Sequence, residues 1–330
     1  KGADVVAGGV EQVERPDGPR PPPGHQGGDS QQQDIGGCCR GENRQHFEGL
    51  GLQWGVLLGG MPQQLIPQVV ATVLKAGGTR PAWRWNVNKT DFYLMAWPKD
   101  EPVRACVVMA GPEGDKLHPL DAFPMAEGLP NDAKVAETHP WKVGVGGNVA
   151  VTMTEGRSPM WFYDPVFERD YDMLTEGVTQ TFLLSGVCLS IRKALLDDIT
   201  ITKGPQFEVY AQDWLEKNPG KTGLDVPPLK FNLKGRHLIM PGRQFCEYQM
   251  RATVEDVDDC KLDRMDIRIL YVSFPFDDRP SLQLPLYAPK SVLKDFDPKA
   301  GDEIDAYVWL QGRVTDQDEQ LNDVPETPVQ

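Results

Sequence analysis

The chain has 330 residues, and its 48 acidic and 34 basic side chains give a net charge of −14. Apolar residues make up 40% of it and charged residues 25%, as in a globular protein with a packed core. Such an acidic chain is poorly suited to functions whose affinity comes from neutralising phosphates. No apolar run reaches the roughly 18 residues that a membrane helix needs, so the membrane-spanning, collagen-like and coiled-coil classes are excluded.

Residues 1–60 differ in composition from everything that follows. They contain 15 of the 33 glycines and only two aromatic residues, Phe47 and Trp54. Such a segment buries too little apolar surface to offset the entropy of the chain. We therefore expect a disordered arm over 1–60, which either is a flexible linker or does not belong to the native protein. We expect the native chain to start at Met61, and a chain that begins there to melt within a few degrees of the full chain.

The remaining residues predict mostly strands. Apolar residues at helical spacing after Met61 predict one helix, and Phe207, Tyr210 and Trp214 predict another. Two aromatic runs on either side of Asn88 predict a hairpin. The expected parts are an N-terminal β unit over 61–190, an α/β connector over 191–245, a C-terminal β unit over 246–314 and an acidic disordered tail over 315–330.

The cysteines and histidines form no recognisable framework. There is no CxxC motif, and the histidines lie outside the spacing of zinc ligands. We therefore expect no metal and no cofactor, and Cys188 should be a small core residue rather than a nucleophile. Scattered cysteines in a chain of this length favour a cytoplasmic location. The six cysteines are Cys38, Cys39, Cys106, Cys188, Cys246 and Cys260.

Two stretches of the chain look like copies of each other, displaced by 124 positions. The identical residues are Tyr163 with Tyr287, Pro165 with Pro289 and Gly177 with Gly301. A shared spacing of turn residues and apolar faces is stronger evidence for duplication than identity alone. A further glycine follows in each copy, Gly186 and Gly312, which requires two additional residues in the second copy. We therefore predict an internal duplication.

The apolar positions extend this alignment. On the strand before the tyrosines, Val149-x-Val151 is expected to correspond to Ile267-x-Ile269. After the glycines, the two additional residues would align Val178, Phe182 and Leu184 with Ile304, Val308 and Leu310. Both glycines should occupy turns with positive φ that lead into the closing strand of each copy.

The second copy has the pattern of a small barrel. Three strands, a short helical connector over 290–296 and a strand that begins after Gly301 resemble an oligonucleotide/oligosaccharide-binding (OB) barrel. We therefore predict a mainly β fold with two tandem, related, OB-like units. No clear fifth strand follows, so a β-sandwich divided between the two copies is the alternative.

Aromatic side chains on the outer strand faces are the candidate partner-binding residues. They alternate with the aliphatic residues that should face the core, and an exposed aromatic face can hold a ligand or a partner. In the alternative interpretation, another element such as the helix over 205–217 covers them. The candidate residues are Trp161, Tyr163, Tyr287, Tyr307 and Trp309.

The leading functional hypothesis is a non-catalytic protein that binds a protein partner. Single-stranded nucleic-acid binding by the OB-like units is the first alternative. The loop over 255–266 opposes it, because its six acidic and two basic residues would repel phosphates. The second alternative is a hydrolase that uses clustered carboxylates. Those carboxylates belong to Asp164, Glu168, Asp170 and Asp172.

Overall fold

The computed structural model describes residues 50–59, 61–76, 83–142, 144–153, 159–195, 198–275 and 281–315. The described chain is mainly β, as predicted, and it divides into two compact units. Residues 198–234 form one unit, here called the insert, and the other described residues form the body. The expected acidic tail, apart from its first residue, and most of the expected arm lie outside the described residues.

The insert is a small α/β element between two parts of the body chain. Strand β9 (Asp198–Ile201) pairs antiparallel with β10 (Leu229–Asn232). Helix α5 (Pro205–Lys217) and the short 3-10 helix η3 (Gly223–Asp225) lie between them in sequence, so the helix predicted here is confirmed. Of the side chains that the structure describes in the insert, only that of Val226 is buried.

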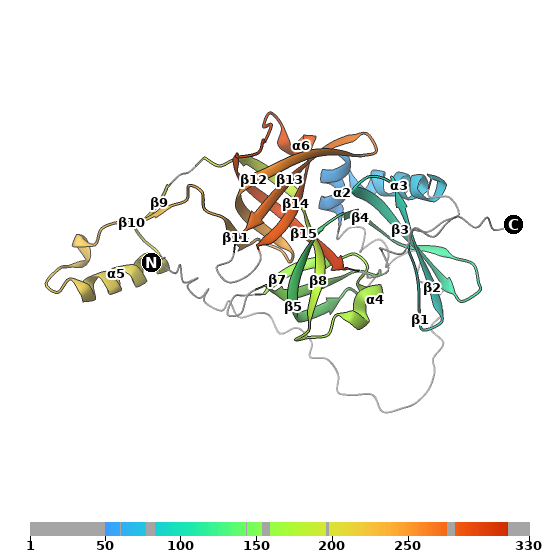
Figure 1. Ribbon diagram of the computed structural model, residues 1–330, viewed down its shortest axis with the longest axis horizontal. Coiled ribbons are helices and arrows are strands. Elements are labelled where there is room, and N and C mark those ends of the chain that lie inside the picture. The colour runs from blue at the N-terminus through green and yellow to red at the C-terminus, as the bar shows by residue number, and fades with distance from the viewer. Residues whose placement is uncertain are drawn as a thin grey trace, which may run out of the picture. The chain divides into compact units, whose positions relative to one another are not determined.

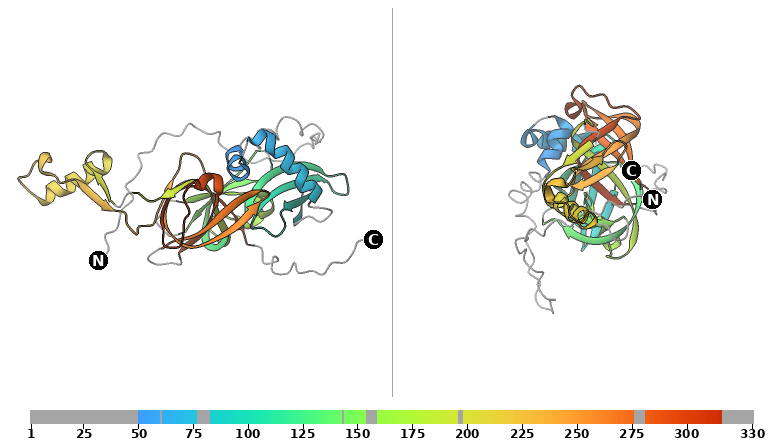
Figure 2. Two further views of the ribbon diagram at one scale, coloured as in Figure 1. Left: turned by 90° about the horizontal axis from the view of Figure 1, so that it is seen from above. Right: turned by 90° about the vertical axis from the view of Figure 1, so that its left-hand side faces the viewer.

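The N-terminal part of the body is an antiparallel sheet in the order β1-β2-β3-β4, covered by two helices. Figure 2 shows the helices α2 and α3, in blue, beside this sheet. The predicted hairpin is confirmed, because Val87 pairs with Thr90 across a two-residue turn. The bounds are α2 (Gly51–Leu58), α3 (Pro62–Ala76), β1 (Trp83–Val87), β2 (Thr90–Trp97), β3 (Val103–Pro112) and β4 (His118–Ala126).

Helix α2 corrects the expected extent of the N-terminal arm. Trp54 and Leu57 are completely buried, and Leu50 just before the helix is 1% exposed. The glycines of this segment do not prevent a helix, because Gly59 ends α2 at a φ of 70°. Residues 50–59 therefore belong to the packed body, and the expected arm is too long at this end.

The rest of the body is a nine-stranded mixed sheet that contains two closed rings of strand pairs. Strands β12, β13, β14, β8 and β15 form one ring, which closes because β15 also pairs with β12. Strands β5, β6, β7, β15 and β8 form the other, which closes because β8 also pairs with β5. Figure 1 shows the first ring mainly in orange and the second mainly in green. We call them the C-terminal ring and the N-terminal ring.

The fifth strand of each ring comes from the other half of the body. Strand β8 follows β5, β6 and β7 in sequence and completes the C-terminal ring. Strand β15 follows β12, β13 and β14 and completes the N-terminal ring. Leu286 of β14 pairs in parallel with Gly186 of β8, and Tyr163 of β7 pairs in parallel with Gln311 of β15. Strands β8 and β15 are shared by both rings and run antiparallel to each other. The bounds are β5 (Leu129–Pro140), β6 (Gly147–Thr152), β7 (Met160–Asp164), α4 (Phe167–Asp170), η2 (Tyr171–Met173), β8 (Thr179–Lys193), β11 (Leu238–Pro241), β12 (Glu247–Leu262), β13 (Met265–Phe274), β14 (Leu282–Pro289), α6 (Lys290–Leu293) and β15 (Glu303–Val314).

Gly177 and Gly301 occupy matching turns at the start of these long strands. Their φ angles are 82° and 89°. The N–H of Gly177 donates to the carbonyl of Val135 at 2.8 Å, and the N–H of Gly301 donates to the carbonyl of Val254 at the same distance. Val135 then donates back to the carbonyl of Val178, and Val254 donates back to that of Asp302. Val178 therefore corresponds to Asp302 rather than to Ile304, and the expected two-residue insertion is wrong.

The expected correspondence of Val149-x-Val151 with Ile267-x-Ile269 is also wrong. Val149 and Val151 pair with Phe162 and Met160, and they contribute to the core inside the rings. The residues that pair with the matching positions Leu286 and Leu284 are Leu270 and Val272. Ile267 and Ile269, which the alignment selected, belong to a different apolar cluster. The expected correspondence was displaced by three residues along β13. It therefore selected side chains on the opposite face of that strand.

The apolar residues of the body form two clusters. The first draws on the inward faces of all eight ring strands and includes Phe162, Phe182 and Leu284. The second joins the outer face of the rings to the four-stranded sheet and its helices, and includes Phe123 and Trp309. The ring strands are therefore apolar on both faces over much of their length. No helix in the described residues is long and apolar enough to cross a membrane.

Candidate functional site

Three of the five predicted site residues are buried rather than exposed. Tyr163, Tyr287 and Trp309 have at most 4% of their surface exposed. They lie in the cluster between the rings and the four-stranded sheet, so elements of the body cover them. The Tyr287 hydroxyl donates to the carbonyl of Glu127 at 2.8 Å. These three aromatic side chains stabilise the contact between the two sheets. They do not form an outer face available to a partner.

Tyr163 is the most enclosed of these residues. Its ring lies between Trp141, at 4.7 Å between centroids, and Trp309, at 5.4 Å. Its hydroxyl has no hydrogen-bond partner among the described residues. Burial, with the nearby carboxylates of Asp121 and Asp164, raises the pKa of Tyr163 well above its ordinary value. The ring therefore stays neutral and acts as a packing residue.

Trp161 and Tyr307 are the two predicted site residues that remain partly exposed. The Tyr307 hydroxyl donates to the carboxylate of Glu247 and accepts the backbone N–H of Arg243 at 3.0 Å. It thereby holds the segment between β11 and β12 against β15. Trp161 has a different environment, because its indole contacts two further exposed rings.

The indole of Trp161 lies in an exposed row of three rings, which we call the ring surface. It stacks on His139 at 5.2 Å between centroids with an interplanar angle of 21°. Phe245 meets it edge-on at 5.4 Å and 76°. Phe245 is 64% exposed, and the His139 side chain is 55% exposed. These three aromatic side chains lie on the outer face of the N-terminal ring of strands.

The strand register explains how these rings meet. Trp161 of β7 pairs with Ala150 of β6, and Ala150 pairs with Glu137 of β5. The side chains of Trp161, Ala150 and Glu137 therefore lie on the same face of the sheet. Ala150 has only a methyl group, which leaves room for the indole to reach His139 on β5. The backbone N–H of Trp161 donates to the hydroxyl of Tyr248 at 2.6 Å, which fixes β7 against β12.

Two exposed basic residues lie close in sequence to residues of the ring surface. Lys142 lies in the loop that joins β5 and β6, and Arg243 is two residues before Phe245. Neither side chain forms an ion pair with another described residue. The nearby acid Glu137 is engaged, because its carboxylate contacts the Nε2 atom of His139 at 2.8 Å.

Sequence reasoning found Trp161 and missed His139 and Phe245. His139 lies next to the last residue of β5, and Phe245 lies in the turn between β11 and β12. The available signal for Phe245 was a large aromatic residue beside Gly242 and Arg243, in a segment with no apolar alternation. Such a residue has no core face to join, which favours exposure.

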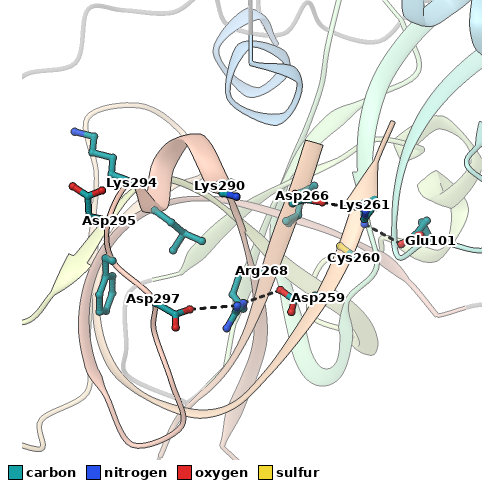
Figure 3. Close-up of a pocket in the computed structure, with 13 residues that line it drawn as sticks. Glu101, Asp259, Cys260, Lys261, Asp266, Arg268, Lys290, Lys294, Asp295 and Asp297 are labelled. Carbon is teal, nitrogen blue, oxygen red and sulfur yellow. Dashed lines mark hydrogen bonds and ion pairs between the residues drawn. The ribbon is translucent and has the colours of Figure 1, made fainter. Parts of the chain in front are cut away.

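A charged groove also lies on the C-terminal ring. It has a volume of about 650 Å³, and Figure 3 shows its lining residues. Arg268 contacts Asp259 at 2.8 Å and Asp297 at 3.3 Å, and Lys261 contacts Asp266 at 3.3 Å. These ion pairs neutralise much of the charge that a ligand could use, so the groove is a weaker candidate than the ring surface.

The carboxylates of the hydrolase alternative divide into two buried and two more accessible residues. Asp164 and Asp170 are completely buried, whereas Glu168 and Asp172 are not. Asp170 accepts from Arg169 Nε at 2.7 Å and from the backbone N–H of Val314 at 2.9 Å. This anchors the segment of α4 to the end of β15, and it gives the buried pair a structural role.

Asp164 is buried with an incomplete set of partners. Its Oδ1 atom accepts the backbone N–H of Val166 at 2.9 Å, and its Oδ2 atom has no hydrogen-bond partner among the described residues. Burial first, and then the negative charge of Asp170, raise the pKa of Asp164 well above its ordinary value. A buried carboxyl group of this kind favours its neutral form.

The described cysteines are free and buried, and burial raises the pKa of Cys106 and of Cys188 to about 12. Within the described residues, no group of three or more His, Cys, Asp or Glu side chains is placed to hold a metal ion. No family model matches the chain, and no curated protein or solved structure matches it either. The ring surface is therefore the feature of the described residues from which a function can be inferred.

Proposed function

We propose that this chain is a non-catalytic binding protein that engages a macromolecular partner through the ring surface. We further propose that its two rings are OB-like barrels that arose by internal duplication. The observation that carries the functional part is the exposed row of His139, Trp161 and Phe245. Tryptophan, tyrosine and arginine are the side chains most enriched among those that dominate binding energy, and Trp161 lies at the centre of this row.

The order of the strands supports the OB-like part of the proposal. In an OB barrel, a five-stranded Greek-key arrangement, strand one pairs with strands two and four, and strand three lies parallel to strand five. The C-terminal ring has this order, with α6 between its third and fourth strands. Strand β8 of the other half takes the place of the fifth strand, which is why no fifth strand follows in sequence.

The matching turns support the duplication. Gly177 and Gly301 have the same sign of φ and the same hydrogen bonds to the first strand of their ring. The N-terminal ring also has the strand order of the C-terminal one, with α4 and η2 in the position of α6. Two unrelated segments would not be expected to share the strand order, the turn and the pairing register together.

The position of the ring surface also favours binding. Trp161 lies on β7, the third strand of its ring, and His139 lies close to the loop between strands one and two. OB barrels bind their ligands on the face of strands two and three and on the neighbouring loops. The partner expected from the acidic composition is a protein.

A photocrosslinking experiment tests the proposed function without assuming the partner's class. The full chain would carry benzoylphenylalanine at position 245 and be irradiated in an extract of cells that contain the native protein. Tyr171, which is 58% exposed, lies on η2 and is not a residue of the ring surface, is the matched control position. We expect a discrete adduct from position 245 only. Equal labelling from both positions, or no adduct at 245, would contradict the proposal.

A further inference from the structure

We infer that the part of the acidic tail that follows Thr315, residues 316–330, docks as an added strand along the free edge of β1. This edge belongs to the four-stranded sheet of the body, and it is separate from the ring surface. Three features favour the contact: the unpaired backbone groups of β1, the place where β15 ends, and the charges of the two segments.

Strand β1 has a row of unpaired backbone groups along one edge. It is the end strand of its sheet, and β2 is its one neighbour among the described strands. Val87 pairs with Thr90 across the two-residue turn, so alternate residues of β1 bond to β2. The intervening Arg84 and Asn86 direct their N–H and C=O groups away from β2, and no described backbone group bonds to them. Two residues of an added antiparallel strand would satisfy all four groups.

The sequence of β1 does little to protect this edge. Exposed edges usually carry prolines, several charges or a bulge, which prevent pairing with other chains. Strand β1 contains no proline, its pairing with β2 continues without a bulge, and Arg84 is its only charged residue. Trp83 and Trp85 increase its tendency to pair, because aromatic residues favour strands. A segment that covers the edge would therefore protect the chain from non-specific association.

The tail begins beside β1. The Cζ atom of Arg313, near the end of β15, lies 4.9 Å from the centre of the Trp83 ring. Thr315 is the last described residue, and residues 316–330 follow it in the sequence. An extended segment of five residues is about 17 Å long and matches the five residues of β1. The tail is therefore long enough to reach the edge and cover it without any change in the body.

The charges of the two segments are complementary. Residues 316–330 contain five acidic side chains and no basic one. Arg84 on β1 and Lys89 in the turn that follows are exposed, and neither forms an ion pair with another described residue. Attraction between these opposite charges selects the acidic tail over an uncharged strand.

Hydrogen exchange, measured by NMR on the full chain, tests the contact. We expect the amides of Arg84 and Asn86 to exchange roughly 10-fold or more slowly than in a chain that ends at Thr315. The amide of Trp85 faces β2 in both proteins and is the matched control. A synthetic peptide of residues 316–330 should restore slow exchange when it is added to the shortened chain. The same peptide with Asn and Gln in place of its acids should restore less.

Charge variants test the contact without shortening the chain. Arg84→Glu reverses the exposed charge of β1 and should remove most of the protection, whereas Arg84→Gln should retain part of it. Lys142→Glu reverses an exposed charge outside the four-stranded sheet and is the control, which should leave the exchange unchanged. Thermal unfolding verifies that each variant keeps the folded body.

Three results would overturn the inference. The first is fast exchange of both outward amides in the full chain, and the second is equal exchange with and without the tail. The third is protection that increases with protein concentration, because it would assign the edge of β1 to a second copy of the chain. None of these results would affect the proposed function, since the ring surface does not include β1.

Discussion

Gly186 of β8 pairs with Leu310 of β15, and Leu310 is also the residue that lies 124 positions after Gly186. The strand pairing therefore joins two positions that the offset of 124 residues also relates. The neighbouring pairs follow the same exchange, because Leu184 pairs with Gly312 and Cys188 pairs with Val308. A local two-fold relationship between β8 and β15 thus passes through the pair of Gly186 and Leu310.

The glycines of these strands should be intolerant of a methyl group. A Cβ atom at Gly186 would lie within 3.0 Å of Val308 and Leu286, and one at Gly312 would lie within 3.0 Å of Leu184 and Phe162. We expect Gly186→Ala to destabilise the protein by about 1–3 kcal/mol through overpacking.

Urea unfolding would measure this cost. In the Gly186→Ala background, Val308→Ala should be less harmful than it is alone, because it removes one of the two clashing groups. Gly223→Ala is the matched control, since a Cβ atom there meets nothing within 4 Å. Additive effects of the Gly186 and Val308 changes would argue against the packing described.

The turns at Gly177 and Gly301 should be sensitive for a different reason. A Cβ atom at Gly301 meets no other atom within 4 Å, so the cost of Gly301→Ala arises only from its φ of 89°. We expect a loss of about 1–3 kcal/mol at each position, and similar losses because the settings match. Equilibrium unfolding of both variants checks this, and a neutral result at one position only would show that the turns are not equivalent.

Helix α2 should contribute substantially to stability. Replacement of the fully buried Trp54 by Ala should cost about 3–5 kcal/mol, whereas Leu52→Ala, at a position 54% exposed, should cost less than about 0.5 kcal/mol. A chain that begins at Met61 lacks the helix altogether and should melt roughly 10 °C or more below the full chain. Calorimetry would compare the three proteins, and equal melting temperatures would contradict the packing of α2.

Asp164 should make stability depend on pH. Its pKa in the folded protein lies above that of the unfolded chain, so its contribution to stability is complete below about pH 4 and is lost as the pH rises through the folded pKa. Asp164→Asn removes the ionisable group but keeps an oxygen that can accept from Val166. The stability of this variant relative to the wild type should therefore increase with pH. Urea unfolding at several pH values tests this, with the exposed Asp172→Asn as control, and parallel curves for variant and wild type would contradict it.

The strands of the second half could be predicted from the sequence, because turn residues and alternation mark them directly. Gly301 and the alternation from Ile304 to Leu310 identified the closing strand of the second half. The register of β13 could not be predicted, because Ile269 and Leu270 are both buried, one on each face. Alternation distinguishes an inner from an outer face only where one of them contacts water.

The residues of the proposed ring surface were predictable only in part, for a related reason. Trp161 and Tyr163 lie on the same strand face, and sequence assigned them the same environment. The structure separates them, because Tyr163 is completely buried within the cluster between the rings and the four-stranded sheet, whereas Trp161 only packs against that cluster and stays partly exposed. The extent of a covering layer depends on contacts between segments far apart in the chain, which local patterns do not contain.

The sharing of β8 and β15 between the rings has a consequence for how the body unfolds. Phe182 and Leu184 fill the N-terminal ring, while Gly186 of the same strand borders side chains of the C-terminal ring. Detachment of β8 would expose the apolar interior of both rings at once. Neither half can therefore melt as an independent subdomain, and the body should lose its structure in a single cooperative transition.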